Sequence, residues 1–307
     1  MRNSDVNELS DSHDFRVFFD TVWRGKFLIV FVASIFTVAA VMYALSLPNK
    51  YKADVLLAPV SEQSSGLLSG QLGGLAAMAG ISLGAGSSSD KSALALEILR
   101  SREFLTRFID KHQLKDELLA ATGWNSQTNQ LVFDPDIYEI KTGEWVREVK
   151  PGKSKTPSSQ EAYEEFLKIF QVAIREEKRS RMFVLSIEHY SPELVQEWVS
   201  LLVSEINSEM KLRDQMEANR SVEYLNKQIQ ETTLSEIRSS LYMLLEEQMK
   251  TLMMTNVRDE YVFKTIDPAV IPEEKSNPKR ALIVIFAFLL GVSLSVLFLM
   301  IRRSLKS

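Results

Sequence analysis

The sequence has no cysteine among its 307 residues and only three histidines. The absence of cysteine excludes disulfide bonds, thiolate metal sites and a cysteine nucleophile. His13, His112 and His189 lie far apart, so no two of them have the spacing of metal ligands. A phosphate-binding loop ending in Lys-Ser/Thr is also missing, as is a dinucleotide fingerprint. The sequence therefore gives no catalytic, metal-binding or cofactor-binding residues, and His189 is predicted to be ordinary surface.

Strong positive charge is missing as well. The formal net charge is −4. Domains that bind nucleic acid usually carry a pronounced basic surface, so nucleic acid is not a predicted partner.

Long apolar runs are present, at residues 27–47 and 281–301, and each has 21 residues without a charge. A helix of that length, rising about 1.5 Å per residue, matches the roughly 30 Å hydrocarbon core of a bilayer. Both runs are predicted to be transmembrane helices. They divide the chain into a tail at 1–26, a middle domain at 48–280 and a tail at 302–307.

The orientation of the spans is predicted from the basic residues of the short tails, which are Arg16, Arg24, Lys26, Arg302, Arg303 and Lys306. Short segments rich in Lys and Arg remain in the cytoplasm. Both termini are therefore predicted to be cytoplasmic, with the middle domain on the other side. A cleaved signal peptide is the alternative for the first run, and the long tail before it, which contains acidic residues, disfavours cleavage.

The middle domain is predicted to mix helices and strands. Alternating or helical apolar spacing predicts strands at 51–60, 181–190 and 261–266 and helices at 92–113 and 161–175. Seven of the 12 glycines lie at 66–86. This segment fits either a loose apolar loop or close backbone packing, whereas a third span is disfavoured by its many glycines and serines.

A long helical region is predicted at 192–257. Ser191 and Pro192 are typical of a helix start, and no glycine or proline follows before Pro268. The region forms either one very long helix or a hairpin turning near Thr232, where Thr233 and Glu236 match a capping box.

The polar middle of this region has a narrow apolar stripe, which predicts either a solvated helix face or a contact between subunits. The candidate subunit contacts are Ile206, Met210 and Met216. After the last strand, Pro268, Pro272 and Pro278 predict an extended, semi-rigid strut at 268–278 that leads into the second span.

This order of parts resembles the chain-length determinant family, the Wzz-type polysaccharide co-polymerases of bacterial inner membranes. The resemblance is carried by the runs Asn256–Pro272 and Ser276–Leu282, by Gly291 within the second span, and by Ser191–Leu194 and Ser101–Leu105. The most specific part is the motif formed by Pro268, Pro272, Pro278 and Gly291. Relatives often have a further proline where this chain has Arg280-Ala281-Leu282, and the short second tail places it with relatives that lack a kinase domain.

The resemblance implies an α+β periplasmic domain with a long α-helical extension, anchored by two transmembrane helices and assembled as a homo-oligomer. It implies a non-enzymatic scaffold, without a cofactor, that regulates the modal chain length of O-antigen or a related lipid-linked polysaccharide. The implied partner is a membrane polymerase of the Wzy type, and the growing glycan is a further candidate. A periplasmic sensor or adaptor and a membrane-bound glycan enzyme are the alternatives.

Overall fold

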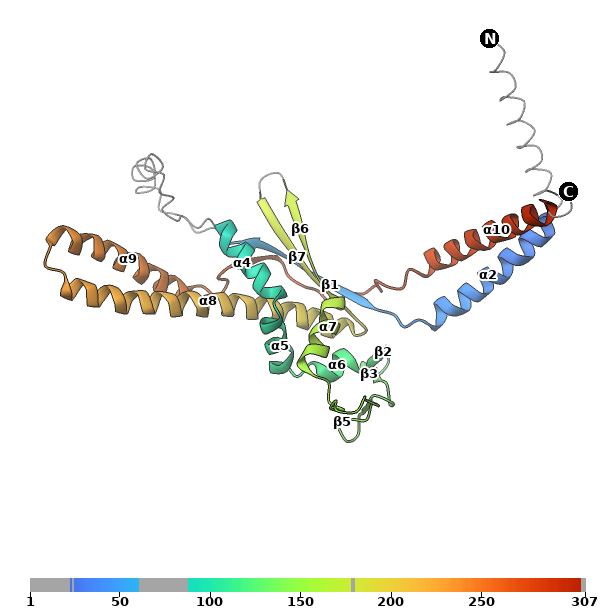
Figure 1. The fold of residues 1–307 in the computed structure, drawn as a ribbon, viewed down its shortest axis with the longest axis horizontal. Coiled ribbons are helices and arrows are strands. Elements are labelled where there is room, and N and C mark those ends of the chain that lie inside the picture. The colour runs from blue at the N-terminus through green and yellow to red at the C-terminus, as the bar shows by residue number, and fades with distance from the viewer. Residues whose placement is uncertain (1–22, 24, 61–87, 178–179, 305–307) are drawn as a thin grey trace, which may run out of the picture. The chain divides into compact units, whose positions relative to one another are not determined.

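The computed structural model describes residues 23, 25–60, 88–177 and 180–304, and the chain separates into two units. One unit comprises residues 1–50 and 275–307, and the other comprises residues 51–274 (Figure 1). The glycine-rich segment 66–86, with its alternative interpretations, lies outside the described residues.

The first unit contains two long apolar helices, α2 (Lys26–Ser46) and α10 (Arg280–Ser304), which lie side by side (Figure 1). Both are long and apolar enough to cross a membrane. Many of their large side chains, including Phe27, Phe31, Phe286 and Phe298, are exposed. Such exposure is costly in water and favourable in lipid, so the two helices fit the predicted two-pass membrane protein.

The second unit is built on a four-stranded antiparallel sheet with the order β6-β7-β1-β8. Its strands are β1 (Tyr51–Pro59), β6 (Phe170–Glu177), β7 (Ser180–His189) and β8 (Phe263–Asp267). Two small hairpins are separate from it, β2 (Ala121–Asn125) with β3 (Gln130–Phe133) and β4 (Tyr138–Glu139) with β5 (Glu144–Trp145).

The described residues of the second unit form six helices: α4 (Ser88–Arg100), α5 (Arg102–Lys111), α6 (Lys115–Leu119), α7 (Ser159–Ile169), α8 (Pro192–Glu231) and α9 (Ser235–Val257). The first half of α8 packs on β1 and β7. Val55 and Leu57 of β1 and Trp198 and Leu202 of α8 are buried in one shared core. Mixed helix and sheet with long helices confirms the predicted α+β class.

Two predicted helices have different limits in the structure. The helix expected at 92–113 is interrupted at Ser101, whose hydroxyl accepts a hydrogen bond from the Phe104 amide (3.3 Å) and so starts α5 as an N-cap. The helix expected at 161–175 ends at Ile169, and residues from Phe170 onward form β6. Pairing of β6 with β7 outweighs the local helical pattern because it completes the sheet.

The long helical region is a hairpin (Figure 1). Ser191 caps the start of α8 as predicted, through a hydrogen bond from the Leu194 amide (3.4 Å). The helix ends before Thr232, and α9 returns antiparallel along α8. The expected capping box is wrong, because Leu234 occupies the N-cap position of α9 and makes no side-chain cap.

Candidate functional site

The two apolar helices of the first unit approach each other closely at Gly291. A Cβ atom placed on this glycine would lie 3.0 Å from the Cα of Ala33 and 3.1 Å from the Cβ of Phe36. A methyl group at position 291 would require α2 to give way by a few tenths of an ångström, and a larger side chain would require more. Small residues that allow such an approach are typical of paired membrane helices, so the packing gives Gly291 a physical role.

Hydrogen bonds join the C-terminal end of α2 to the N-terminal end of α10. Nη2 of Arg280 donates to the carbonyl oxygen of Leu47 (3.2 Å) and to Oδ1 of Asn49 (3.1 Å). The amide of Lys50 donates to the carbonyl oxygen of Asn277 (2.9 Å). The segment that leaves the first span is thus tied to the segment that enters the second.

The three motif prolines lie between β8 and α10, a stretch with no helix or extended strand among its described residues. Pro268 is exposed, whereas Pro272 and Pro278 are partly buried. This arrangement fits an extended connection. The specific role of the prolines stays a prediction.

The structure corrects two of the three predicted subunit contacts. Ile206 is 0% exposed and Met210 is 2% exposed, and both lie in the core of their own chain. The apolar stripe on this part of α8 is narrow, yet Ile206 and Met210 share the core with residues of β1, β7 and β8, which the helical pattern alone does not reveal. Met216, at 45% exposure, remains a candidate contact.

Among the described residues of the second unit, the largest set of exposed apolar side chains lies on α9. Thr255 is the one buried residue among those of α9. The exposed large apolar residues of this helix are Ile237, Tyr242, Met243, Leu244, Met249, Met253, Met254 and Val257. An exposed apolar surface of this extent is typical of a region that contacts another protein. The sequence analysis did not assign this part of the helical region to subunit contact.

Asn207 was not singled out from the sequence, although it organises the connection between α9 and β8. Its Oδ1 accepts hydrogen bonds from the amides of Tyr261 (3.1 Å), Val262 (2.8 Å) and Phe263 (3.0 Å). Its Nδ2 donates to the carbonyl oxygen of Phe263 (3.0 Å). The sequence does contain a signal of this role, because Asn207 places a polar side-chain amide directly after Ile206 within the apolar stripe of α8. Such a buried polar group needs partners.

His189 is not the surface residue that the sequence predicts. It is buried, its ring lies 5.0 Å from the ring of Trp198, and its Nε2 donates to the carbonyl oxygen of Glu117 (3.1 Å). Position 189 ends β7, and α6 and α8 cover that end of the sheet. The strand pattern does not predict this cover.

Two carboxylates of α8 form ion pairs with residues of α5 and with His112 directly after it. Glu205 lies 2.6 Å from Nζ of Lys111 and 3.3 Å from Nε2 of His112, and Glu209 lies 2.6 Å from Nη2 of Arg107. Burial acts to raise the pKa of Glu205, but the hydrogen bonds and charges of Lys111 and His112 lower it overall. These groups hold two helices together. Among the described residues, no group of three His, Cys, Asp or Glu side chains has a geometry that could hold a metal ion.

Both ends of the chain match known protein families. Residues 11–112 match the family Wzz, described as chain length determinant protein. Residues 231–304 match the family GNVR, described as "G-rich domain on putative tyrosine kinase". Together the two ranges include more than half of the chain. The chain belongs to the chain length determinant family.

Two solved structures are distantly similar to this chain length determinant. One is a full-length bacterial polysaccharide co-polymerase, with 12% identity, coverage of 94% of this chain and 97% of its own, and a TM-score of 0.36. The other is a fragment of WzzB, a polysaccharide co-polymerase from Salmonella Typhimurium, with 11% identity, coverage of 75% and 100%, and a TM-score of 0.31. No curated protein matches the chain significantly.

The matched ranges show where the family likeness of this chain length determinant lies. The first range holds α2, β1, α4 and α5, and the second holds α9, β8 and α10 with all four motif residues. Both candidate membrane helices are thus included. The middle, with nearly all of α8, lies outside both matches.

One carboxyl group of this chain length determinant is poised to titrate near neutral pH. Burial, followed by the charges of Asp116 and Glu197, raises the pKa of Glu117 from 4.5 to about 7. The folded protein therefore holds the proton more tightly than the unfolded chain does. Stability is highest below pH 4.5 with respect to this group and falls as the pH rises toward 7.

Glu117→Gln is expected to remove this pH-dependent fall in stability, because glutamine carries no charge to bury. The expected gain above pH 7 is about 1–2 kcal/mol, and it is no larger because solvent screens the charges around a partly exposed side chain. Thermal unfolding of the second unit, followed by circular dichroism between pH 4.5 and 8, measures the effect. The exposed Glu247→Gln is the matched control. Parallel pH profiles for Glu117→Gln and the parent would contradict the assignment.

Proposed function

We propose that this chain length determinant is a non-enzymatic scaffold of the bacterial inner membrane. It regulates the modal chain length of O-antigen or a related lipid-linked polysaccharide, together with a Wzy-type polymerase. The observation that carries the proposal is the family match at both ends, because each matched range includes one of the two candidate spans. The arrangement of the carboxylates on α8, which are used in ion pairs between helices, supports a structural role.

Assembly into a homo-oligomer is part of the proposal. The exposed apolar side chains of α9, with Met216 on α8, are the surface that a second copy covers. Identical subunits that associate through one repeated contact usually form closed, symmetric rings. A ring presents many copies of the same surface to a polymerase and to the growing glycan, which a monomer does not.

The proposed orientation places both termini in the cytoplasm and residues 48–280 in the periplasm. Basic residues in both tails support it. Reporters fused at residues 1 and 307 are expected to show cytoplasmic activity, and a reporter inserted near residue 150 is expected to show periplasmic activity.

Deletion of the gene tests the function directly. The cell's lipopolysaccharide or related glycan, separated on a gel, is expected to lose its modal band and to retain short chains of random length. The intact gene restores the band, and so do versions with alanine at the exposed Glu217 or Glu246, because removing one exposed charge deletes no chemical step. Loss of length control in a normally abundant, assembled Glu217 or Glu246 variant would instead favour the glycan enzyme.

A further inference from the structure

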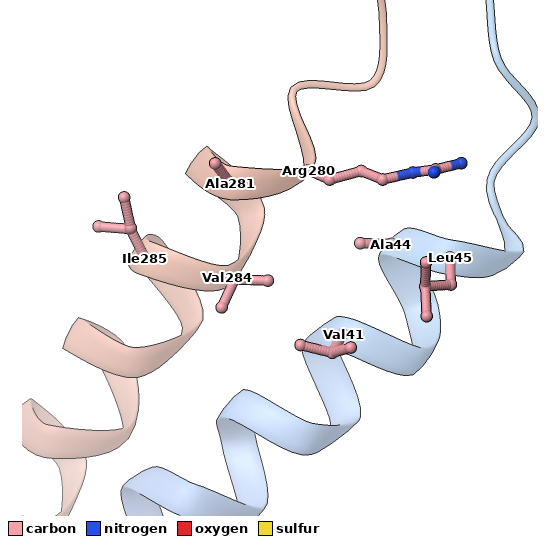
Figure 2. A pocket seen from close by; sticks show the side chains of 7 residues that line it. All are labelled: Val41, Ala44, Leu45, Arg280, Ala281, Val284 and Ile285. Atoms are coloured by element: carbon pink, nitrogen blue, oxygen red, sulfur yellow. The ribbon is translucent and has the colours of Figure 1, made fainter.

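A cavity of about 380 Å³ lies between α2 and α10 at the ends that join the connecting segments (Figure 2). Its volume falls in the range of small-molecule sites in proteins, about 300–1,000 Å³. Six of its seven lining residues are apolar: Val41, Ala44 and Leu45 of α2, and Ala281, Val284 and Ile285 of α10.

The seventh lining residue is Arg280, which extends from the start of α10 toward the end of α2, over Ala44 and Leu45 (Figure 2). Its Nη2 donates to two neutral oxygens, of Leu47 and Asn49. Its Nε is buried and has no hydrogen-bond partner within the described part of the chain. No carboxylate among those residues pairs with it, so an uncompensated positive charge lies at the mouth of an apolar cavity. The Nε atom is enclosed, whereas Nη1 makes no hydrogen bond within the described part of the chain, so Nη1 is the atom left for an acceptor supplied from outside the chain.

Position along the spans restricts the chemistry of the ligand. The cavity is bounded by two helices that fit membrane spans, and the charged residues Lys279 and Arg280 directly precede the apolar run 281–301. Arginine at the end of a span lies at the level of the lipid headgroups. Guanidinium N–H groups donate charge-assisted hydrogen bonds to phosphate oxygens.

We propose that this cavity binds one anionic phospholipid. An acyl chain occupies the apolar space between Val41 and Val284, and the headgroup phosphate accepts hydrogen bonds from Arg280. A single guanidinium matches one phosphate better than the diphosphate of a lipid-linked sugar, and a cavity of this volume suits one acyl chain better than a long polyprenyl chain. The inference rests on the two spans and is independent of the polysaccharide that the protein regulates.

The test uses the purified full-length protein in detergent, titrated with phosphatidylglycerol and followed by native mass spectrometry. Phosphatidylglycerol is expected to bind more tightly than phosphatidylcholine, whose choline cation opposes Arg280. Arg280→Gln is expected to weaken phosphatidylglycerol binding about ten-fold or more, the loss typical of a hydrogen bond to a charged group. Arg302→Gln, which removes the same charge at the other end of α10, is the matched control and is expected to bind normally.

A second variant tests the cavity separately, because Arg280→Gln also removes the hydrogen bonds to Leu47 and Asn49. Ala281→Phe fills the cavity from its exposed rim and keeps Arg280, so it is expected to weaken binding to a similar extent. Ser293→Phe, at an exposed position of the same helix outside the cavity lining, is its control.

Three results would overturn the proposal. The first is unchanged phosphatidylglycerol binding in Arg280→Gln and Ala281→Phe. The second is equal affinity for glycerol phosphate, which has no acyl chain and would reveal a simple phosphate site. The third is binding of undecaprenyl phosphate more than about ten-fold tighter than that of phosphatidylglycerol, a difference of about 1.4 kcal/mol that would assign the cavity to a polyprenyl lipid.

Discussion

Asn207→Leu is expected to unfold the end of the hairpin and to destabilise the second unit by about 4 kcal/mol or more, since four hydrogen bonds of a buried amide are lost. Leucine has the same number of side-chain heavy atoms and the same branching, so the substitution leaves no cavity. The amides of Tyr261, Val262 and Phe263 and the carbonyl oxygen of Phe263 are left without this partner. The sum is comparable to the whole stability of an ordinary domain, about 5–15 kcal/mol.

Asn219→Leu is the matched control for this prediction. Asn219 lies on the same helix, three turns further along, and is exposed, so its replacement is expected to change stability by no more than about 0.5 kcal/mol. Urea or thermal unfolding of both purified variants, followed by circular dichroism, gives the difference. An Asn207→Leu protein that unfolds within 1 kcal/mol of the parent, a loss typical of one ordinary hydrogen bond, would show that other contacts hold β8 in place.

Gly291→Leu is expected to separate the two spans and to abolish length control while leaving the second unit folded. The added side chain meets the backbone of Ala33 and the Cβ of Phe36, neither of which can move without displacing α2. Overpacking of a close contact usually costs about 1–3 kcal/mol. Membrane helices associate mainly through such packing, because lipid supplies no hydrophobic force between them, so this loss is large relative to what holds the pair.

The lack of native cysteine makes this prediction directly measurable. Val41 and Val284 face the same cavity from opposite helices (Figure 2), so cysteines introduced at both positions report the pairing by their cross-linking yield. Gly291→Leu is expected to lower that yield several-fold and to remove the modal band of the glycan. Ser293→Leu, exposed on the same helix, is expected to change neither. Full cross-linking in the Gly291→Leu protein would rule out a role for this glycine in pairing the spans.

The sequence predicted those features of the fold that depend only on residues close together in the chain. Ser191 and Pro192 mark the start of α8 because capping involves residues only a turn apart. The apolar alternation that predicts a strand at 51–60 corresponds to the buried residues Ala53, Val55 and Leu57 of β1. Both spans follow from length and apolar composition alone.

The remaining features depend on contacts between distant segments. Residues 170–175 were expected to continue a helix but pair with β7 instead, and the burial of His189 comes from helices that cover the sheet end. Ile206 and Met210 were assigned to a neighbouring subunit because the stripe is narrow, whereas the sheet of their own chain covers them. The four hydrogen bonds of Asn207 join residues more than 50 positions apart, a separation that no local pattern spans.

The strand order has a consequence for how the chain is made. β1 ends at Pro59 and β8 begins at Phe263, yet the two strands are neighbours in the sheet. During synthesis, β7 can pair with one side of β1 as soon as it emerges, but the other side waits until α8 and α9 have been completed. Until then β1 presents unpaired amides and carbonyl groups along an open edge, a surface on which nascent chains aggregate. The arrival of β8 both closes that edge and brings its amides to Asn207, so the last strand synthesised completes the sheet and fixes the hairpin in one step.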